Sequence, residues 1–125
     1  MKTEDFVEKL AEAQDLMKDE KYQDAIVLLE KLKEIEKKGE FDYSLTHTLY
    51  QLLSNSHSLY NQQTILKIID DICKNQDYIE VSQLNDILKK NSILNLEDSI
   101  LCREIELLIL RGLLPYKFDG QKILF

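Results

Sequence analysis

The side chains that most often carry chemistry are sparse in this sequence. Its two histidines are His47 and His57, and its two cysteines are Cys73 and Cys102. These four residues lack the close spacing that holds a structural zinc ion. We therefore interpret His47 as a helix-surface residue and His57 as a loop residue. Both cysteines are interpreted as free thiols on apolar helix faces, and no metal site is expected.

Motifs that activate a nucleophile or hold a phosphate are also missing. The chain has three glycines, and they form neither a phosphate-binding loop nor a Gly-x-Ser-x-Gly elbow. Asp70 and Asp71 are adjacent carboxylates, but neighbouring helix positions point about 100° apart, so a solvated face is the simpler interpretation. We therefore expect no catalytic residues, no cofactor and no small-molecule substrate, and hence a protein that is not an enzyme.

Length and charge narrow the class of protein further. A chain of 125 residues can bury a core without disulfides or metals, and its three glycines and one proline disfavour long linkers and all-β folds. Residues 1–77 contain 16 acids and 10 bases, whereas residues 78–125 contain 7 acids and 6 bases. Neither part has the clustered lysines and arginines that displace counterions from nucleic acid, so a nucleic-acid partner is not expected.

The sequence also predicts a compartment. No apolar run is long enough to span a membrane, and the opening residues MKTEDFVEKL lack the apolar segment of a signal peptide. Two unpaired cysteines are typical of a reducing environment. We therefore expect an intracellular protein, cytoplasmic or nuclear, without a membrane partner.

The last third of the chain, from Tyr78 to Phe125, predicts a strand, two helices and a hairpin in that order. The strand covers residues 78–81, Ser82 is positioned to cap the first helix, and Asn95 is positioned to cap the second. A further helix is expected before the strand, from Asn61 to Lys74. The complete order of helix, strand, helix, helix, strand, strand is that of a winged helix.

The last of these helices has a well-defined predicted end. Arg111 supplies a cation in the last turn, and Gly112 follows as a residue that adopts the left-handed conformation without penalty. We expect Gly112 to end the helix and to direct Leu113 and Leu114 against the core.

Asp119-Gly120 predicts the turn of a β-hairpin whose arms are residues 114–118 and 121–125. Asp-Gly favours a type I′ turn, in which both central residues have positive φ. An isolated hairpin is marginal in water, so it needs the strand at residues 78–81 as a third member. Its apolar side chains exceed what a free hairpin hides, which makes them the candidate partner-binding residues. They are Tyr116, Phe118, Ile123 and Phe125.

In the first half of the chain, apolar residues recur at helical spacing. We expect helices at about residues 3–19, 22–38 and 41–55. A polar break at Ser54–Ser58 would then separate the third helix from the one that begins at Asn61. The link between the first two helices is short, so these helices must pack antiparallel.

The run AEAQDLMKDEKYQDAIVLLEKL resembles one tetratricopeptide-type helical hairpin. The resemblance implies that Ala25 lets the two helices approach and that Tyr22 fills the space beside the turn. One repeat does not make a solenoid, because about three are needed for stability. The residues at the packing positions of such a repeat are Ala13, Leu16, Tyr22, Ala25, Ile26 and Leu29.

The expected fold class is therefore mainly α, with TPR-like antiparallel helical hairpins followed by a winged helix that ends in a small β-hairpin. Residues 1–60 form the helical-repeat-like part and residues 61–125 the winged-helix part, packed as one continuous unit. This order resembles the PCI domain of proteasome-lid, signalosome and translation-initiation-factor subunits. The matching residues are YIEVSQLNDILK and EIELLILRGLLPYKFDGQKILF, in which Lys117-Phe118-Asp119 takes the place of the family's Gly-x-Asp turn.

The PCI resemblance implies a protein-assembly module in which an edge of the small sheet pairs with a neighbouring subunit. A second resemblance competes with it. The runs AIVLLEKLKEI, SLTHTLYQLL and ILKIIDDICKN are similar to the N-terminal helical bundle of transcription elongation factors. That family usually has a tryptophan near the end of its last helix, and this chain has none.

We therefore expect a non-catalytic interaction or scaffold module of a multi-subunit complex, with protein partners. The alternative is a winged-helix DNA-binding or transcription-associated regulator, including the elongation-factor-like bundle. In that alternative the recognition helix would be residues 95–111, which carry four acids and two bases. Such a helix would repel phosphates, so the interaction module is preferred.

Overall fold

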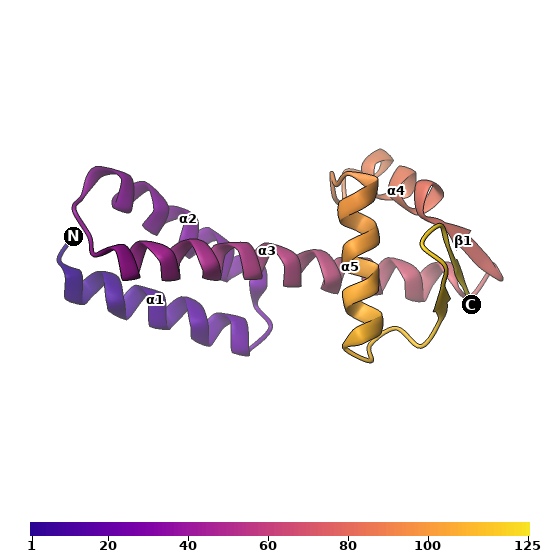
Figure 1. Cartoon of the computed structure of the whole chain (residues 1–125), viewed down its shortest axis with the longest axis horizontal. Coiled ribbons are helices and arrows are strands. Elements are labelled where there is room, and N and C mark those ends of the chain that lie inside the picture. Colours follow the sequence, from indigo (N-terminus) through magenta and orange to yellow (C-terminus); the bar gives the residue numbers. More distant parts are fainter. The chain divides into compact units, whose positions relative to one another are not determined.

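The computed structural model describes residues 1–125 and is mainly helical, with one small antiparallel sheet (Figure 1). Its elements are α1 (Thr3–Lys18), α2 (Tyr22–Lys38), α3 (Tyr43–Ile72), β1 (Tyr78–Glu80), α4 (Val81–Lys90), α5 (Asp98–Leu110), β2 (Lys117–Phe118) and β3 (Lys122–Leu124). The chain divides into two compact units, Met1–Tyr60 and Asn61–Phe125, and α3 contributes residues to both.

In the first unit, α1 and α2 form an antiparallel hairpin, as the short link between them predicts (Figure 1). The helix α1 ends because Glu20 adopts a left-handed conformation, with φ of 60°. Its backbone N–H donates to the carbonyl of Met17 at 3.0 Å, and the N–H of Lys21 donates to the carbonyl of Leu16 at 2.9 Å. These two bonds are the Schellman pattern, which satisfies carbonyls that a helix end otherwise leaves unpaired.

The core of the first unit lies between these helices and the first half of α3. Ala13 and Ala25 are completely buried and allow close approach of the helices on which they lie. The ring of Phe6 stacks on that of Phe41, with 4.4 Å between centroids. The buried residues of this cluster are Phe6, Leu10, Ala13, Leu29, Leu32, Leu49 and Leu53.

The expected break at Ser54–Ser58 is wrong, because α3 is one helix from Tyr43 to Ile72. The sequence expectations of a third helix at residues 41–55 and of a cap at Asn61 are therefore corrected. Ser56 is completely buried and lies on the same helical face as Leu49 and Leu53. The inward periodicity thus continues through the polar run, which contains no proline or glycine to interrupt it.

In the second unit, β1, β3 and β2 form a sheet in that order, with β3 in the centre. Both pairings are antiparallel, and Ile79 lies opposite Ile123. The backbone N–H of Val81 donates to the carbonyl of Gln121 at 2.8 Å, and that of Phe125 donates to the carbonyl of Asp77, also at 2.8 Å. These bonds extend the pairing of β1 and β3 beyond both ends of β1.

Both helices that follow β1 begin at residues other than the expected caps. Glu80, not Ser82, precedes α4 and forms a reciprocal capping box with Gln83, whose side-chain oxygen accepts from the Glu80 N–H at 3.1 Å. Glu97, not Asn95, precedes α5. The side-chain amide of Asn85 on α4 donates to the carbonyl of Leu96, just before α5, at 3.0 Å. It also donates to the carboxylate of Asp98, the first residue of α5, and so connects the two helices.

The predicted end of α5 at Gly112 is found in the structure, with φ of 74°. The Gly112 N–H donates to the carbonyl of Ile109 at 3.0 Å, and the Leu113 N–H donates to that of Leu108 at 3.0 Å. Leu114 is buried, as expected, but Leu113 is 46% exposed. The expectation that Leu113 also packs on the core is therefore wrong.

The hairpin turn is found at Asp119-Gly120, but it is not of type I′. Only Gly120 has positive φ, at 92°. Asp119 instead uses its side chain, whose Oδ1 accepts from the N–H groups of Gln121 and Lys122, both at 2.8 Å. A carboxylate that bonds the backbone two and three residues ahead stabilises a turn without left-handed backbone at the aspartate itself.

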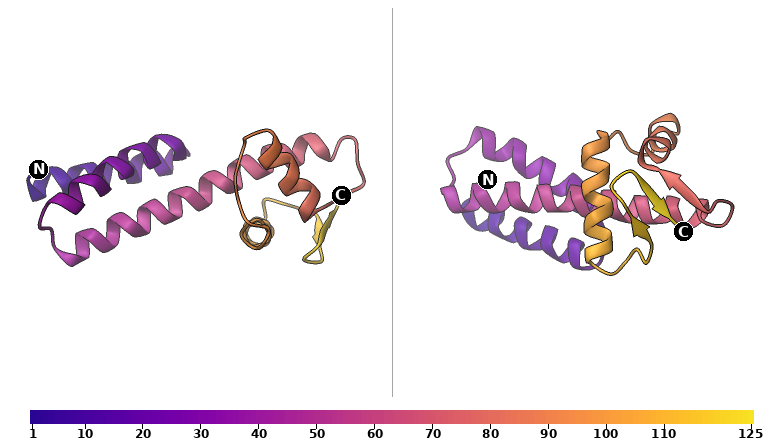
Figure 2. Two further views of the ribbon diagram at one scale, coloured as in Figure 1. Left: turned by 90° about the horizontal axis from the view of Figure 1, so that it is seen from above. Right: turned by 45° about the vertical axis from the view of Figure 1, so that its right-hand side comes forward.

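The core of the second unit joins the second half of α3 to α4, α5 and the inner face of the sheet. Figure 2 shows the chain leaving α5 to form the β2–β3 hairpin beside β1. The buried members of this cluster are Ile65, Ile69, Ile79, Val81, Leu84, Leu88, Leu101, Ile105, Leu108, Leu114 and Ile123.

Candidate functional site: the C-terminal sheet

The residues capable of chemistry lie apart from one another. His47 stacks on the ring of Tyr43 at the exposed start of α3, with 6.2 Å between centroids. His57 lies elsewhere on α3, with its Nε2 3.7 Å from a carboxylate oxygen of Glu30. Cys73 and Cys102 are free thiols, and no group of three or more potential ligands that could hold a metal ion occurs.

Cys102 lacks the environment of a reactive thiol. Burial, together with the carboxylates of Glu106 and Asp98, raises the pKa of its thiol above the ordinary value of 9.0. Its Sγ lies 3.2 Å from the carbonyl oxygen of Gly120, to which it donates. A thiol held in its protonated form and bonded to the hairpin turn contributes to packing rather than to nucleophilic chemistry.

One carboxylate is buried in the second unit. Glu104 is completely buried on α5, and its Oε2 accepts from the side-chain amide of Gln62 at 3.3 Å. The Arg111 guanidinium donates to the side-chain oxygen of the same Gln62. This network connects α5 to the second half of α3. Its role is therefore to hold the helices that support the sheet.

The four candidate partner-binding residues lie on the inner face of the sheet, toward the core. Ile123 is completely buried, so its side chain is not accessible to a partner, and that expectation is corrected. Tyr116, Phe118 and Phe125 are half-buried against the same cluster. The rings of Tyr116 and Phe125 meet edge to face at 5.1 Å between centroids. A hydrogen bond with the side chain of Cys73 raises the pKa of Tyr116.

The outer face of the sheet carries a different set of side chains. Tyr78 is 49% exposed and Leu124 is 42% exposed, and these two residues lie opposite each other on β1 and β3. Lys117 lies opposite Leu124 on the other side, so Tyr78, Leu124 and Lys117 form one row across the three strands. The ammonium group of Lys122 lies 5.6 Å from the centroid of the Tyr78 ring.

These outer residues were not predicted as contacts, although the signal was present in the sequence. Successive residues of a strand point to opposite faces. If Phe118 and Ile123 face the core, then Lys117 and Leu124, each adjacent to one of them, must face solvent. An apolar set that includes three aromatic rings is more often the buried face of a small sheet than an exposed one.

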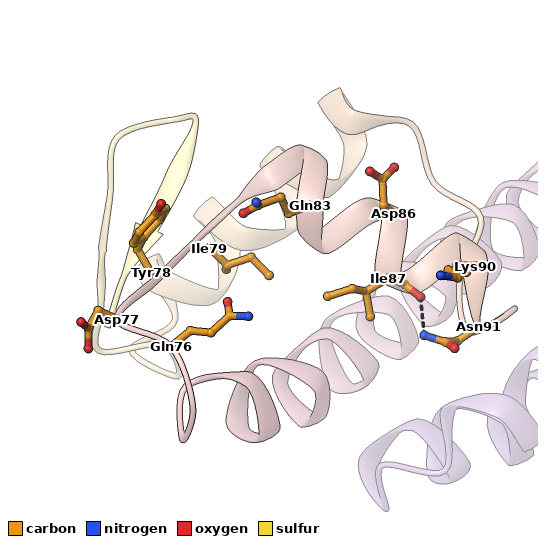
Figure 3. Close-up of a pocket in the computed structure, with 9 residues that line it drawn as sticks. All are labelled: Gln76, Asp77, Tyr78, Ile79, Gln83, Asp86, Ile87, Lys90 and Asn91. Carbon is orange, nitrogen blue, oxygen red and sulfur yellow. Dashed lines mark hydrogen bonds between the residues drawn. The ribbon is translucent and has the colours of Figure 1, made fainter.

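The sheet also has a free edge beside a groove. Because β3 lies in the centre, the side of β1 away from β3 pairs with no strand. A groove of about 810 Å³ runs along this side, between residues 76–79 and one face of α4 (Figure 3). The residues of α4 and its end that line the groove are Gln83, Asp86, Ile87, Lys90 and Asn91.

The groove has an apolar centre flanked by amides. Ile79 and Ile87 point toward each other, and the side chain of Gln76 extends into the same space (Figure 3). Ile79 is completely buried, so the half-buried Ile87 supplies the apolar surface that the groove exposes. The Gln76 amide makes no hydrogen bond within the protein, and Gln83 uses only its oxygen, to bond the N–H of Glu80. Unused amide donors beside an apolar centre are suited to an extended backbone rather than to a reacting small molecule.

No protein-family model matches the sequence, and neither a curated protein nor a solved structure is significantly similar to it. None of its helices has the length and apolar character that a membrane crossing requires. The possible roles of the sheet therefore follow from its own residues and their geometry.

Proposed function

We propose that this protein is a non-catalytic interaction module that scaffolds a multi-subunit complex inside the cell. The order of α3, β1, α4, α5, β2 and β3 supports a winged-helix arrangement for Asn61–Phe125. The antiparallel hairpin of α1 and α2, with its buried Ala13 and Ala25, supports a TPR-like arrangement of these two helices. Together these features fit the resemblance to PCI domains, which assemble subunits.

The observation that carries this proposal is the free edge of β1 beside its groove. The carbonyl of Asp77 and the N–H of Val81 both bond to the β3 side of the sheet. Ile79 lies midway between them and opposite Ile123, so its backbone groups point toward β3 as well. In an antiparallel pair, alternate residues point their N–H and C=O groups to opposite sides. The N–H and C=O of Tyr78 therefore point away from β3, toward the groove, where they lack a strand partner.

A strand from a protein partner would satisfy these groups. Addition of a strand to an open edge uses main-chain hydrogen bonds for affinity and pockets for alternate side chains for specificity. The half-buried Ile87 provides a contact for one apolar side chain of that strand, and Gln76 and Gln83 provide amide donors beside it. The edge is short, so the expected contact is one part of a larger interface.

The test compares two substitutions at one exposed position. Tyr78→Pro removes the N–H that faces the groove, whereas Tyr78→Ala removes the same side chain and keeps that N–H. Tagged wild-type and variant proteins are expressed in the native cells, and co-purified proteins are identified by mass spectrometry. We expect a stoichiometric partner with wild type, which Tyr78→Pro loses to a much greater extent than Tyr78→Ala does.

Thermal melts of the two variants provide the stability control. The backbone N–H of Tyr78 donates to no other strand, so its loss should cost little stability, and both variants should unfold at similar temperatures. A protein that is monomeric in extract and co-purifies with nothing would contradict the proposal. Tight binding to duplex DNA with a steep dependence on salt would also contradict it, because that behaviour is expected of a winged-helix DNA-binding regulator.

A further inference from the structure

The hairpin turn contains the pair of residues at which an aspartate most readily rearranges its own backbone. Asp119 is the one aspartate in the chain that a glycine follows. Glycine has no side chain to shield its backbone nitrogen, so this nitrogen can approach the carboxyl carbon of the preceding aspartate. Asp119 and Gly120 are both exposed, and a Cβ at Gly120 would meet nothing within 4 Å. Neither neighbouring side chains nor burial therefore protects this pair from reaction.

The rearrangement needs only the chain and water. The backbone nitrogen of Gly120 attacks Cγ of the neutral Asp119 carboxyl group. An N–C bond forms, a C–O bond breaks, and the carboxyl OH leaves with the amide proton as water. The succinimide ring that results takes up water at either of its two carbonyls. One opening restores aspartate, and the other gives isoaspartate, in which the main chain continues through the side-chain carbon.

The folded turn engages the same carboxylate in hydrogen bonds. Oδ1 of Asp119 accepts from the N–H groups of Gln121 and Lys122, both at 2.8 Å. Loss of an oxygen as water requires the neutral acid, whereas bonds from N–H groups favour the ionised form and hold the pKa of Asp119 below its ordinary value. The thiol of Cys102 donates to the carbonyl of Gly120 at 3.2 Å and restrains the second residue of the pair. The turn must therefore open before the ring can form.

We propose that Asp119-Gly120 is a site of spontaneous isomerisation to isoaspartate, and that the folded turn suppresses this reaction, so that the modification marks chains whose hairpin has opened. The reaction then proceeds from a locally open state, and the population of that state sets its rate. This inference concerns the covalent fate of the hairpin and does not depend on the proposed interaction role.

Isomerisation also has a consequence for the sheet. Isoaspartate adds one carbon to the main chain between Phe118 and Gly120 and moves the free carboxylate to the other side of that link. In the unmodified chain, Phe118 on β2 lies opposite Ile123 on β3. An extra backbone atom between the paired strands disturbs this register, and the displaced carboxylate no longer bonds the turn as Asp119 does. We therefore expect the purified isoaspartate form to unfold at a lower temperature than the unmodified chain.

The experiment incubates the full chain at physiological temperature and neutral pH and follows isoaspartate over several weeks. Trypsin cleaves after Lys117 and Lys122 and so releases residues 118–122 as one peptide that contains the site. Chromatography against synthetic standards separates the aspartate and isoaspartate forms of this peptide. The same measurement on the chain denatured in guanidinium chloride gives the rate of the open turn. The free peptide, with and without denaturant, corrects for any effect of the denaturant on the chemistry.

The folded chain should isomerise at least about tenfold more slowly than the denatured chain, because hydrogen bonds to a charged acceptor stabilise more than neutral ones do. Hydrogen exchange of the Lys122 N–H measures opening of the turn independently, and its protection should agree with this ratio in order of magnitude.

Two substitutions at one exposed position test the turn bonds themselves. Gln121→Pro removes one of the N–H groups that bond Asp119, whereas Gln121→Ala removes the same side chain and keeps that N–H. Both variants retain Asp119-Gly120, and Gln121→Pro should isomerise several-fold faster than Gln121→Ala.

A folded chain that isomerises as fast as the denatured chain would overturn the proposal, as would a denatured chain that forms no isoaspartate. Equal rates in folded Gln121→Pro and Gln121→Ala would also overturn it. Circular dichroism checks that both variants are folded. If the proline variant is not, the comparison of folded with denatured wild type still decides, because it requires no substitution.

Discussion

Single residues end three of the helices in the same way. Glu20, Ser92 and Gly112 all have positive φ, at 60°, 55° and 74°. In each case the backbone N–H of this residue donates to the carbonyl three residues earlier, in the last turn of the helix. Glycine adopts this conformation freely, whereas glutamate and serine pay a steric cost, so the same backbone motif differs in stability among the three sites.

Substitution at Gly112 tests that cost directly. A Cβ at Gly112 would meet nothing within 4 Å, so no clash contributes and the penalty is that of the left-handed backbone alone. We expect Gly112→Ala to lower the free energy of unfolding by about 1 kcal/mol, and the β-branched Gly112→Val to lower it by more. Urea unfolding measures both values.

The matched comparison is Ser92→Gly, which relieves the same strain at the end of α4 and should raise stability, by about 0.5 kcal/mol. Gly39 is not a neutral comparison, since its φ is −117° and an added Cβ would lie 2.7 Å from the Phe41 ring. Unchanged unfolding of Gly112→Val would contradict the left-handed exit from α5.

The Asp119 carboxylate provides a prediction about pH. The backbone N–H groups of Lys122 and Gln121 hold the pKa of Asp119 below its ordinary value of 3.8. A lowered pKa in the folded state means that the carboxylate stabilises the hairpin above that value, and that the contribution is lost as pH falls through the lower folded pKa.

An NMR titration of the Asp119 side-chain carbon should therefore show a midpoint below 3.8. Asp119→Asn keeps an oxygen acceptor for the same N–H groups but does not titrate, so its hairpin amide shifts should stay constant over that range. A midpoint at or above the ordinary value would show that the turn bonds do not persist in solution.

At the scale of elements, the continuity of α3 distinguishes this fold from two separate helices. The run from Ser54 to Ser58 is polar, and each of its residues is a poorer helix former than alanine. The helix nevertheless runs through it, because Leu49, Leu53 and Ser56 maintain one buried face. Burial along one face outweighs a few tenths of a kcal/mol of propensity per residue.

Asn55→Pro distinguishes a continuous α3 from two helices that are separated by a break at Ser54–Ser58. Asn55 is exposed and lies within α3, so proline removes a backbone hydrogen bond and clashes with the preceding turn. We expect a loss of about 3 kcal/mol or more in the free energy of unfolding and a loss of helix signal in far-UV circular dichroism. Asn55→Ala, which suits a helix better, should be neutral or stabilising. Tolerance of the proline would indicate a real break at this position.

At the scale of the whole molecule, two separate clusters of buried side chains hold the two units. Leu29 is completely buried in the cluster of the first unit, and Ile105 is completely buried in that of the second. Each cluster is therefore the main source of stability for its own unit, while α3 contributes residues to both.

Hydrogen exchange of two core variants tests this division. Leu29→Ala and Ile105→Ala should each cost about 2–5 kcal/mol, through lost transfer energy and the cavity left behind. We expect Leu29→Ala to speed exchange mainly in α1 and α2, and Ile105→Ala mainly in α4, α5 and the sheet. Each variant serves as the control for the other. Equal acceleration throughout the chain in both variants would contradict two independently stabilised units.

The sequence alone determined those structural features that are encoded by residues close together in the chain. The bounds of α2, the left-handed exit at Gly112 and the position of the hairpin turn follow from periodicity, from missing Cβ sterics and from the Asp-Gly pair. These features depend on residues within a few positions of one another.

Only the tertiary structure decided which face of the sheet is buried and whether α3 is continuous. Successive side chains of a strand point to opposite faces, and the local backbone energy is the same whichever face is buried. Packing against α4 and α5 determines which face becomes the inner one. That selection buries Ile123 and exposes Tyr78 and Leu124. The course of α3 through Ser56 was likewise set by burial, an interaction between residues distant in the chain that propensity does not record.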